Sequence, residues 1–444
     1  MEISFLHVSL CLLGGIAAIV ILTTFLRVHA FFALLIASFI VGLGVLLPVE
    51  TVMNAVKEGF GNIMRSLGLI IVLGTTLGVI LEHTGATKVM AAFILRRVGD
   101  RRAPLAMSLT GFIVGLPIFC DSGYIVLSGV NNSLAKRTGI PMAVMAGSLA
   151  TGLYAVHCLL PPHPGAAAAA GIIGADFGKL MLFGILIAIP AMITGYAWVR
   201  FAGKNLHSQT NNKEEIRPET GNYPTVLNSF LPVFVPILLI AGRAILMNFT
   251  EAGTTLNQAL FLGDPAIALS VGVVLACTGK RNLTRTAFAS QLQEAAEKAG
   301  GILVIIGAGG AFGAVLALTE IGKHFSDSMP LATMGILFPF LLTAVLKTAQ
   351  GSSTVAIITA ASIILPLMPA LGLDSDNGKI FTVLSMGAGS MMVAHANDAY
   401  FWVIAKFSGL DMRTMLKTYT VSSVLMALVS LLFIYLLSFF IATV

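Results

Sequence analysis

Charged residues are scarce in this chain. Asp, Glu, Lys and Arg together make up 10% of its 444 residues, whereas a soluble globular domain carries about 25%. Apolar residues make up 57% of the sequence, and the mean hydropathy is +0.93. A soluble fold of this size has no room to bury so much apolar surface, so the composition excludes a soluble globular protein. It indicates a membrane protein whose lipid-facing side chains need not be polar.

Cysteine is also scarce. The four cysteines are Cys11, Cys120, Cys158 and Cys277. All of them lie within or beside apolar segments, at spacings that fit neither a zinc site nor a disulfide framework. We therefore expect no bound metal and no cofactor.

A concentrated basic face is missing as well. The formal net charge is +6, but the lysines and arginines occupy short loops between apolar runs, where they orient membrane spans. Nucleic acid is therefore not an expected partner. No lysine or arginine precedes Arg27, so the start of the sequence lacks the charged region of a cleaved signal peptide. We expect the first apolar stretch to remain as a span.

The sequence is rich in apolar stretches close to the length of a membrane-crossing helix, which is about 20 residues. The expected spans are 5–26, 28–47, 66–82, 141–160, 178–199, 228–247, 264–278, 301–318, 380–397 and 420–442. This pattern predicts an all-α polytopic membrane protein with about ten spans.

Two further apolar regions, 103–134 and 331–367, are each interrupted by a short polar tip that contains glycine. The tips are Cys120-Asp121-Ser122-Gly123 and Gln350-Gly351-Ser352-Ser353-Thr354. We predict two re-entrant hairpins, because irregular backbone at membrane depth must be covered by protein or line a wet cavity. With the N-terminus outside, this topology concentrates basic residues in cytoplasmic loops. Two full crossings per region would leave that distribution unchanged, so this alternative stays open.

One long polar stretch, 202–227, divides the chain. We interpret it as a cytoplasmic linker between an N-terminal half, 1–201, and a C-terminal half, 228–444. The halves repeat weakly: Gly74-Thr-Thr-Leu-Gly78 corresponds to Gly309-Gly-Ala-Phe-Gly313, and a broken hairpin and a histidine-containing span follow in each half. Inverted repeats with discontinuous helices are typical of secondary transporters.

Asp121 is the most informative polar residue. A carboxylate within an apolar segment costs about 2.5–3.5 kcal/mol on insertion scales, and such residues usually serve a transport pathway. Desolvation favours the protonated form of a carboxyl group, which makes Asp121 a candidate proton carrier. The alternative is that its oxygens cap the following half-helix.

Two more polar clusters interrupt apolar segments. His163 stands between prolines shortly after His157, and prolines break a helix and free backbone groups that would line a cavity. The alternatives are a solvated surface loop for His163 and a core position for His157. His395, Asn397 and Asp398 end the penultimate span, where packing alone does not explain three polar side chains in four positions.

Each of these clusters has a structural alternative. Tyr400 and Trp402 follow the last cluster and suit a headgroup belt, so an interfacial anchor is the alternative there. The second tip begins a half-helix whose free amides and dipole suit a carboxylate, and the alternative is that its Ser and Thr residues only cap that helix. The spacing of the histidines does not demand a metal site.

These motifs resemble those of the gluconate permease family, a branch of a wider ion-transporter superfamily, over nearly the whole chain. The resemblance rests on Phe31-Phe-Ala-Leu-Leu35, Gly115-Leu-Pro-Ile-Phe-Cys-Asp121-Ser-Gly123, Pro161-Pro-His163-Pro-Gly165, Gly174-Ala-Asp176-Phe-Gly178, Ile306-Gly-Ala-Gly-Gly310, Gln350-Gly-Ser-Ser-Thr354 and His395-Ala-Asn-Asp398 with Phe401-Trp402.

The resemblance implies a proton symporter that imports gluconate or a related sugar acid across the inner membrane. It also implies that the tips and broken spans form the binding site. The expected substrate-binding residues are Ser122, Gly123, His163, Gly351, Ser352, Ser353, Thr354 and Asn397. The expected proton-coupling residues are Asp121, Asp398 and His395. The expected partners are a small carboxylate, protons and the lipid bilayer, and a homo-oligomer is left open.

Two departures from the family pattern leave the substrate open. Ala166, Ala167 and Ala168 stand where relatives often carry proline and threonine, and Ala399-Tyr400 stands where Pro-Gly or Ser-Gly is frequent. A shorter hydroxy acid such as glycerate, or D-serine, is therefore an alternative substrate, and sodium coupling is an alternative mechanism. A channel is a further alternative to a proton symporter. We expect no enzyme, because the adjacent His157 and Cys158 would not face each other on a helix.

Overall fold

Every regular element in the part of the chain that the structure describes is a helix. This computed structural model describes residues 5–204, 223–247, 260–278, 284–320 and 331–442. The expected linker, 202–227, lies mostly outside the described residues. The all-helical architecture agrees with the predicted class, because a helix satisfies its backbone hydrogen bonds within one segment and needs no water to do so.

The described helices fall before and after the linker in the sequence. The first half contains α1 (Phe5–Val20), α2 (Ala30–Gly44), α3 (Val49–Thr84), α4 (Ala86–Val98), α5 (Ala103–Gly115), α6 (Cys120–Thr138), α7 (Met142–Leu159), α8 (Pro164–Ile173) and α9 (Phe177–Gly203). The second half contains α10 (Val226–Leu246), α12 (Pro265–Thr278), α13 (Arg285–Leu318), α15 (Leu337–Gln350), α16 (Ser353–Ile364), α17 (Met368–Leu371), α18 (Asp376–Gly389), α19 (Ala399–Ser408), α20 (Met412–Met415), the π-helix η7 (Leu416–Thr420) and α21 (Val421–Ala442).

Eight helical segments within the described residues are long and apolar enough to cross a membrane. Three shorter apolar helices, α2, α12 and α15, accompany them. Two long helices exceed the predicted spans: α3 has 36 residues and α13 has 34. At 1.5 Å per residue each extends for about 50 Å, beyond an apolar core of about 30 Å. The extra turns of α3 carry charged residues such as Glu50, Lys57 and Glu58. A search for apolar runs alone therefore misses these turns.

The two long helices cross each other in antiparallel directions and hold the halves together. Gly59 of α3 lies against the backbone of α13 at Gly310, and the Nε2 atom of His83 lies 2.7 Å from Oε2 of Glu294. In addition, α12 packs on α3, and α2 packs on α13. Each half therefore covers the long helix of the other half, so that the described helices form one interlocked unit.

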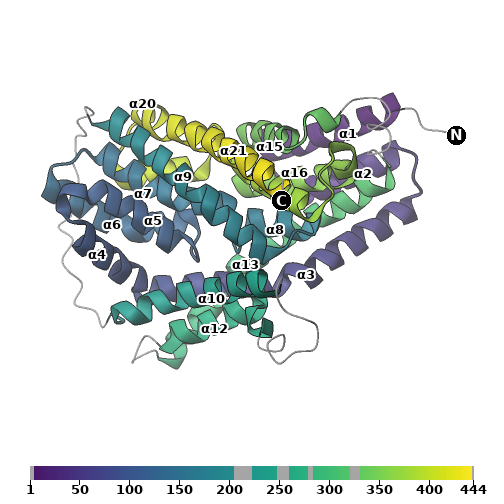
Figure 1. The fold of residues 1–444 in the computed structure, drawn as a ribbon. Helices are drawn as coiled ribbons and strands as arrows, with labels where there is room; N and C mark the ends of the chain where they lie inside the picture. Colours follow the sequence, from purple (N-terminus) through teal and green to yellow (C-terminus); the bar gives the residue numbers. More distant parts are fainter. Residues whose placement is uncertain (1–4, 205–222, 248–259, 279–283, 321–330, 443–444) are drawn as a thin grey trace.

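Figure 1 shows how the helices of the two broken regions are arranged. Figure 1 shows α3, α10, α12 and α13 along the lower side of the view. Helices α4 to α7 gather at one end of the view and α1 and α2 at the other, and α8 lies below α15 and α16.

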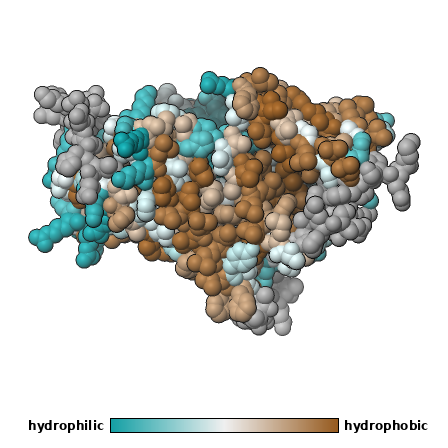
Figure 2. Space-filling view, turned by 90° about the horizontal axis from the view of Figure 1, so that it is seen from above, coloured by the Kyte–Doolittle hydropathy of each residue, from teal (hydrophilic) through white to brown (hydrophobic). Residues whose placement is uncertain are grey.

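The surface has the composition that lipid requires. Figure 2 shows a broad apolar face, with hydrophilic residues gathered mainly toward one end. Large apolar side chains such as Leu186 and Ile193 of α9 and Leu432 of α21 are more than half exposed. Exposed apolar area this extensive marks a surface that contacts something other than water. The chain is therefore a multi-pass membrane protein, as its composition predicts.

The close contact between α3 and α13 gives a first testable prediction. A side chain at Gly59 would clash with the backbone at Gly310 and Ala311, whereas Gly61 on the same helix faces open space. We expect Gly59→Val to lower the free energy of unfolding by about 1–3 kcal/mol, the usual penalty of overpacking. Gly61→Val makes the same chemical change without the clash. Thermal unfolding of both purified variants in detergent compares them, and equal midpoints would contradict this packing.

Candidate functional site

The break between α5 and α6 spans residues 116–119, so the predicted tip 120–123 lies just after it, in the first turn of α6. We call residues 116–123 the first tip. Pro117 lies in the segment between the helices and has no N–H to continue α5. Gly78 of α3 faces the Pro117 carbonyl, at 2.7 Å from the position a Cβ would take. Asp121 lies in the first turn of α6, but Phe119 is the N-cap residue and no side chain caps this helix. The capping interpretation of Asp121 is therefore wrong, and its role needs another explanation.

The second tip (residues 350–354) separates α15 from α16. Gly351 ends α15 with a left-handed backbone, φ +79°. A Cβ atom at this position would clash with the backbone carbonyl of Asn397. Ser352 is the N-cap of α16, and its hydroxyl accepts a hydrogen bond from the Val355 N–H at 3.3 Å. Ser352 therefore does cap the half-helix. The backbone amides in the first turn of α16 lie at the second tip.

The first break (residues 160–163) follows α7. Pro161 and Pro162 end the helix there, since neither can donate a backbone hydrogen bond. His163 is buried, with 1% of its surface exposed, and its Nε2 lies 2.7 Å from the carbonyl oxygen of Gly115 at the end of α5. A solvated loop is therefore the wrong interpretation of His163. Its ring centroid lies 5.0 Å from that of His157.

The second break (residues 390–398) shortens the predicted span 380–397. Helix α18 already ends at Gly389, and the chain then turns irregularly through Val393, whose φ of +44° is strained for a β-branched residue. The N–H of Ala394 donates to Oγ of Ser423 at 3.2 Å, and Thr420 in the π-helix η7 donates to the Ala394 carbonyl. These contacts hold the break in place, because a conformation of this kind persists only where its surroundings determine it.

The second break binds the end of α15. The Asn397 amide donates to the Thr348 carbonyl at 2.8 Å, and Nε2 of His395 lies 3.3 Å from the same oxygen. The final carbonyls of a helix have no partner within it. Asn397 thus does in the second half what His163 does in the first: it satisfies a carbonyl at the end of the hairpin's first helix.

A buried ion pair fixes the same junction. Nζ of Lys347 lies 2.7 Å from Oδ2 of Asp398, and the two side chains are 0% and 8% exposed. Lys347 also donates to the Gly351 carbonyl at 3.0 Å. Asp398 caps α19 through the Tyr400 N–H at 2.9 Å. Sequence reasoning missed Lys347, although a lone lysine in the apolar segment before Gly351 was a usable signal.

The two tips and two breaks meet one another. Asp121 at the first tip lies close enough to Asp398 to interact with it electrostatically. Gly165, just after the first break, packs against Thr354 at the second tip. Of the sequence-predicted residues, Gly351, His395, Asn397 and Asp398 are directly joined by contacts. His163 is joined to the first tip. Ser122 and Ser353 show no side-chain hydrogen bond among the described residues, and their predicted role in substrate binding stays a prediction.

Several buried polar atoms at this meeting point have no hydrogen-bond partner within the described residues. They are Nδ1 of His157, Nδ1 of His163, and both amide atoms of Gln350. A carbonyl can only accept a hydrogen bond, so Nε2 of His163 must carry the proton. In the neutral ring Nδ1 is then an acceptor. Buried groups of this kind are normally satisfied, so the site has unused capacity for a polar ligand.

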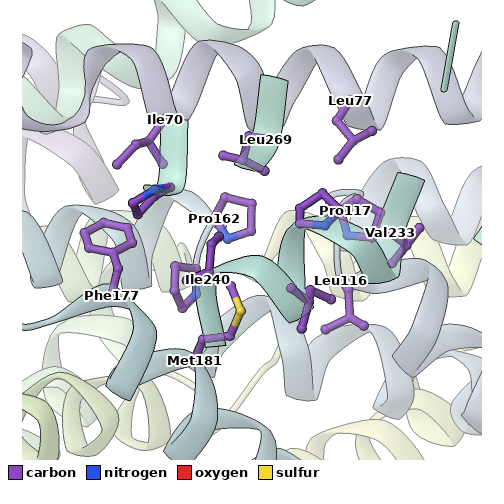
Figure 3. Close-up of a pocket in the computed structure, with 14 residues that line it drawn as sticks. Ile70, Leu77, Leu116, Pro117, Pro162, Phe177, Met181, Val233, Ile240 and Leu269 are labelled. Carbon is purple, nitrogen blue, oxygen red and sulfur yellow. The ribbon is translucent and has the colours of Figure 1, made fainter. Parts of the chain in front are cut away.

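A small cavity lies beside the first tip and first break but has different chemistry. Figure 3 shows that Pro117 and Pro162 line it together with Leu77 of α3 and Ile240 of α10. Its volume is about 30 Å³, and every lining residue is apolar. A hydroxylated anion would find no hydrogen-bond partner there, and burying it unpaired would be unfavourable. The cavity is therefore not the site for such a ligand.

The aromatic residues after the second break divide into two groups. Tyr400 is buried, with 3% of its surface exposed, and its ring centroid lies 5.7 Å from that of Tyr154. It is therefore not an interfacial anchor. Trp402 is 47% exposed, and its indole N–H donates to the Ala396 carbonyl at 2.7 Å. Only Trp402 has the exposure expected of a residue in a headgroup belt.

Comparisons with known proteins agree on one family. A model described as GntP family permease matches residues 6–440. The chain is 31% identical to a gluconate permease of Pseudomonas aeruginosa, over 95% of this chain and 96% of that protein. It is 30% identical to the Gnt-II system L-idonate transporter of Escherichia coli, over 94% and 96%. The YdaH transporter of Alcanivorax borkumensis has a similar fold, with a TM-score of 0.61 at 17% identity over 89% of this chain and 90% of that chain.

Discontinuous helices that meet inside an apolar bundle, with unsatisfied polar groups between them, define the class: the protein is a multi-pass membrane transporter and not an enzyme. More narrowly, the chain belongs to the GntP permease family. The resemblance seen in the sequence motifs is thereby confirmed.

Gly351 provides a test of the junction between the second tip and the second break. Both Gly351 and Gly372 have a left-handed backbone, with φ of +79° and +68°, but only Gly351 faces another backbone, at Asn397. Any residue other than glycine costs about 1–2 kcal/mol in this conformation. We therefore expect Gly372→Ala to be mildly destabilising, and Gly351→Ala to be more so and to abolish transport. Uptake by membrane vesicles, normalised to protein content, compares the two, and a Gly351→Ala variant that transports normally would contradict the assignment.

Proposed function

We propose that this protein is a proton-coupled symporter that imports gluconate or a related sugar-acid anion across the inner membrane. The observation that carries the proposal is the meeting of two tips and two breaks around unpartnered polar atoms and a buried lysine. A sugar acid combines one carboxylate with several hydroxyls, and the site offers groups for both. The names of the relatives from Pseudomonas aeruginosa and Escherichia coli support the same substrate class.

The carboxylate would bind at the starts of the half-helices. α6 begins at the first tip and α16 at the second, and a helix N-terminus presents free amides and a positive dipole end. We assign Ser122 and Gly123 at the first tip and Gly351 to Thr354 at the second to this role. Lys347 adds a full positive charge beside Gly351.

The hydroxyls would bind at the breaks. Nδ1 of His163 is an acceptor without a partner in the described part of the chain, and a sugar hydroxyl is a matching donor. The side chain of Asn397 is exposed at the second break, and its amide nitrogen is occupied by the Thr348 carbonyl. Its oxygen remains to accept a second hydroxyl.

The coupled proton would be carried by a carboxyl group at the same place. Asp121, Asp398 and His395 are the candidates, and they differ in what they already contact. Asp398 is paired with Lys347, whereas Asp121 forms no ion pair with any described residue, and the thiol of Cys120 lies 4.0 Å from its Oδ1. A carboxyl group in apolar surroundings is more easily kept neutral than one in water.

Alternating access would follow from an inverted-repeat architecture. The antiparallel crossing of α3 and α13 supports halves 1–201 and 228–444 of opposite orientation, with about ten spans. The helix breaks at the two tips support re-entrant hairpins in 103–134 and 331–367. The parts that bear the hairpins would then move against the rest.

A shorter hydroxy acid, such as glycerate or D-serine, is the second candidate. Ala166, Ala167 and Ala168 are all buried at the start of α8, directly after His163. Alanine offers no hydroxyl at these positions, so fewer substrate hydroxyls can be satisfied there. Sodium coupling is the alternative mechanism.

Uptake into proteoliposomes tests the proposal. We expect labelled gluconate to accumulate on an inward proton gradient with saturable kinetics, and a sodium gradient of the same size to have no effect. Unlabelled glycerate, D-serine and citrate serve as competitors. If one of these competitors enters on the proton gradient while gluconate stays out, the protein is a proton symporter for that acid and not for gluconate. If nothing accumulates on either gradient, the symport proposal fails.

A carboxylate substitution tests the pathway. We expect Asp121→Asn to reduce proton-driven accumulation by at least about tenfold, since an intramembrane carboxyl group is replaced. The matched control is Asp374→Asn, at an exposed position in the loop before α18, which should transport as the unchanged protein does. Full proton-driven uptake by Asp121→Asn would remove Asp121 from the pathway.

A further inference from the structure

Lys347 is in an unusual position for a lysine. Its side chain is fully buried and its ammonium group has two acceptors, Oδ2 of Asp398 at 2.7 Å and the Gly351 carbonyl at 3.0 Å. An ammonium group has three N–H donors, so one is left for another acceptor. Because Gly351 belongs to the second tip, this third donor is adjacent to the start of α16.

A buried cation constrains what else occupies its surroundings. An unpaired charge in an apolar interior is very unfavourable, and removing one partner of a buried pair is far more destabilising than removing both. Lys347 therefore needs one anion at every stage of a transport cycle. In this structure, Asp398 is that anion.

We propose that Lys347 exchanges Asp398 for the substrate carboxylate when the substrate binds, and that Asp398 takes up the coupled proton as it is released. This rests on the proposed symport of a sugar-acid anion. In the empty site, the pair is Lys347 as ammonium and Asp398 as carboxylate. In the loaded site, it is Lys347 as ammonium and the substrate as carboxylate, with a neutral Asp398.

The exchange explains coupling by charge balance. Both states of the pair are neutral overall. A proton bound alone would leave Lys347 without an anion, and a substrate bound alone would add an uncompensated negative charge. Proton and anion therefore enter together, about one to one, and their transport moves no net charge.

The groups around the pair limit where else the proton can go. The titratable groups that interact with Asp398 from neighbouring elements are Cys120, Asp121, Tyr154, Cys158, Tyr400 and Tyr419. The thiols and phenols among them hold their protons at neutral pH. His157 lies near Lys347 itself, and His395 belongs to the same break as Asp398. Asp121 is thus the competing carboxyl group, and the experiment must separate the two acids.

The test compares two transport modes in proteoliposomes with labelled gluconate. One mode is accumulation on a proton gradient. The other is exchange of labelled for unlabelled gluconate at equal pH, which needs binding and movement but no net proton transfer. Asp398→Asn imitates the protonated acid. We expect it to lose accumulation, to retain exchange within about threefold, and to bind gluconate with an affinity that no longer depends on pH.

Lys347 should behave differently. We expect Lys347→Met to lose both modes, with gluconate affinity reduced by about thirtyfold or more. Lys347→Arg keeps the positive charge and should recover part of the exchange. In the unchanged protein, gluconate binding in weakly buffered detergent should take up about one proton per anion.

Three outcomes would overturn the proposal. If the double variant Lys347→Met/Asp398→Asn regains proton-driven accumulation, the pair only stabilises the fold. If Asp121→Asn shows exchange without accumulation while Asp398→Asn still accumulates, Asp121 carries the proton and the symport stands. If Asp398→Asn does not fold, the unchanged protein provides the test: gluconate binding without proton uptake would also overturn the proposal. Failure of the unchanged protein to accumulate any sugar acid contradicts the proposed function instead.

Discussion

A helix that ends inside an apolar protein leaves carbonyls and amides that no water can reach, and the arrangement of this site follows from how those groups are satisfied. At the end of α5 the partner is the imidazole of His163. At the end of α15 the partners are Asn397, His395 and Lys347. His163 comes from the break after α7, and Asn397 and His395 come from the break after α18, so satisfying the helix end also brings the break to the tip. The meeting of tips and breaks is therefore a consequence of backbone chemistry.

The long helices supply the rigidity that such a site requires. α3 and α13 cross through glycine contacts close enough to exclude a side chain at Gly59, and each is covered by helices of the opposite half. A similar close fit occurs where Gly152 of α7 meets the backbone of α5 at Ser108. Small residues give helices in lipid close van der Waals contact, which replaces the hydrophobic driving force that lipid removes. The many glycines of this sequence serve that packing as much as they serve the breaks.

The sequence predicted the helix class, the membrane setting and the position of the second tip, because apolar runs and glycine-containing interruptions are local signals. It placed the first tip at 120–123, just after the actual break at 116–119. It did not predict that α18 ends at Gly389, since residues 390–394 are too apolar to reveal a break that depends on contacts with Ser423 and Thr420. It assigned Asp398 without its partner, because the distance from Lys347 to Asp398 is set by the fold. The interfacial alternative for Tyr400 was wrong for the same reason. The sequence pattern of an aromatic residue next to a span is the same whether lipid or other tyrosines surround that residue.

The junctions at the ends of α5 and α15 are both closed by a side chain from a later break, but they differ in charge. In the first half a neutral imidazole meets the helix end, and a hydrogen bond of that kind persists whatever the protonation of nearby acids. In the second half the same junction contains an ammonium and a carboxylate, whose stability depends on both charges being present. A junction of the first kind is a permanent part of the scaffold. Under the proposed symport, a junction of the second kind can be exchanged by a proton and an anion together, so it is the place where a proton gradient would act.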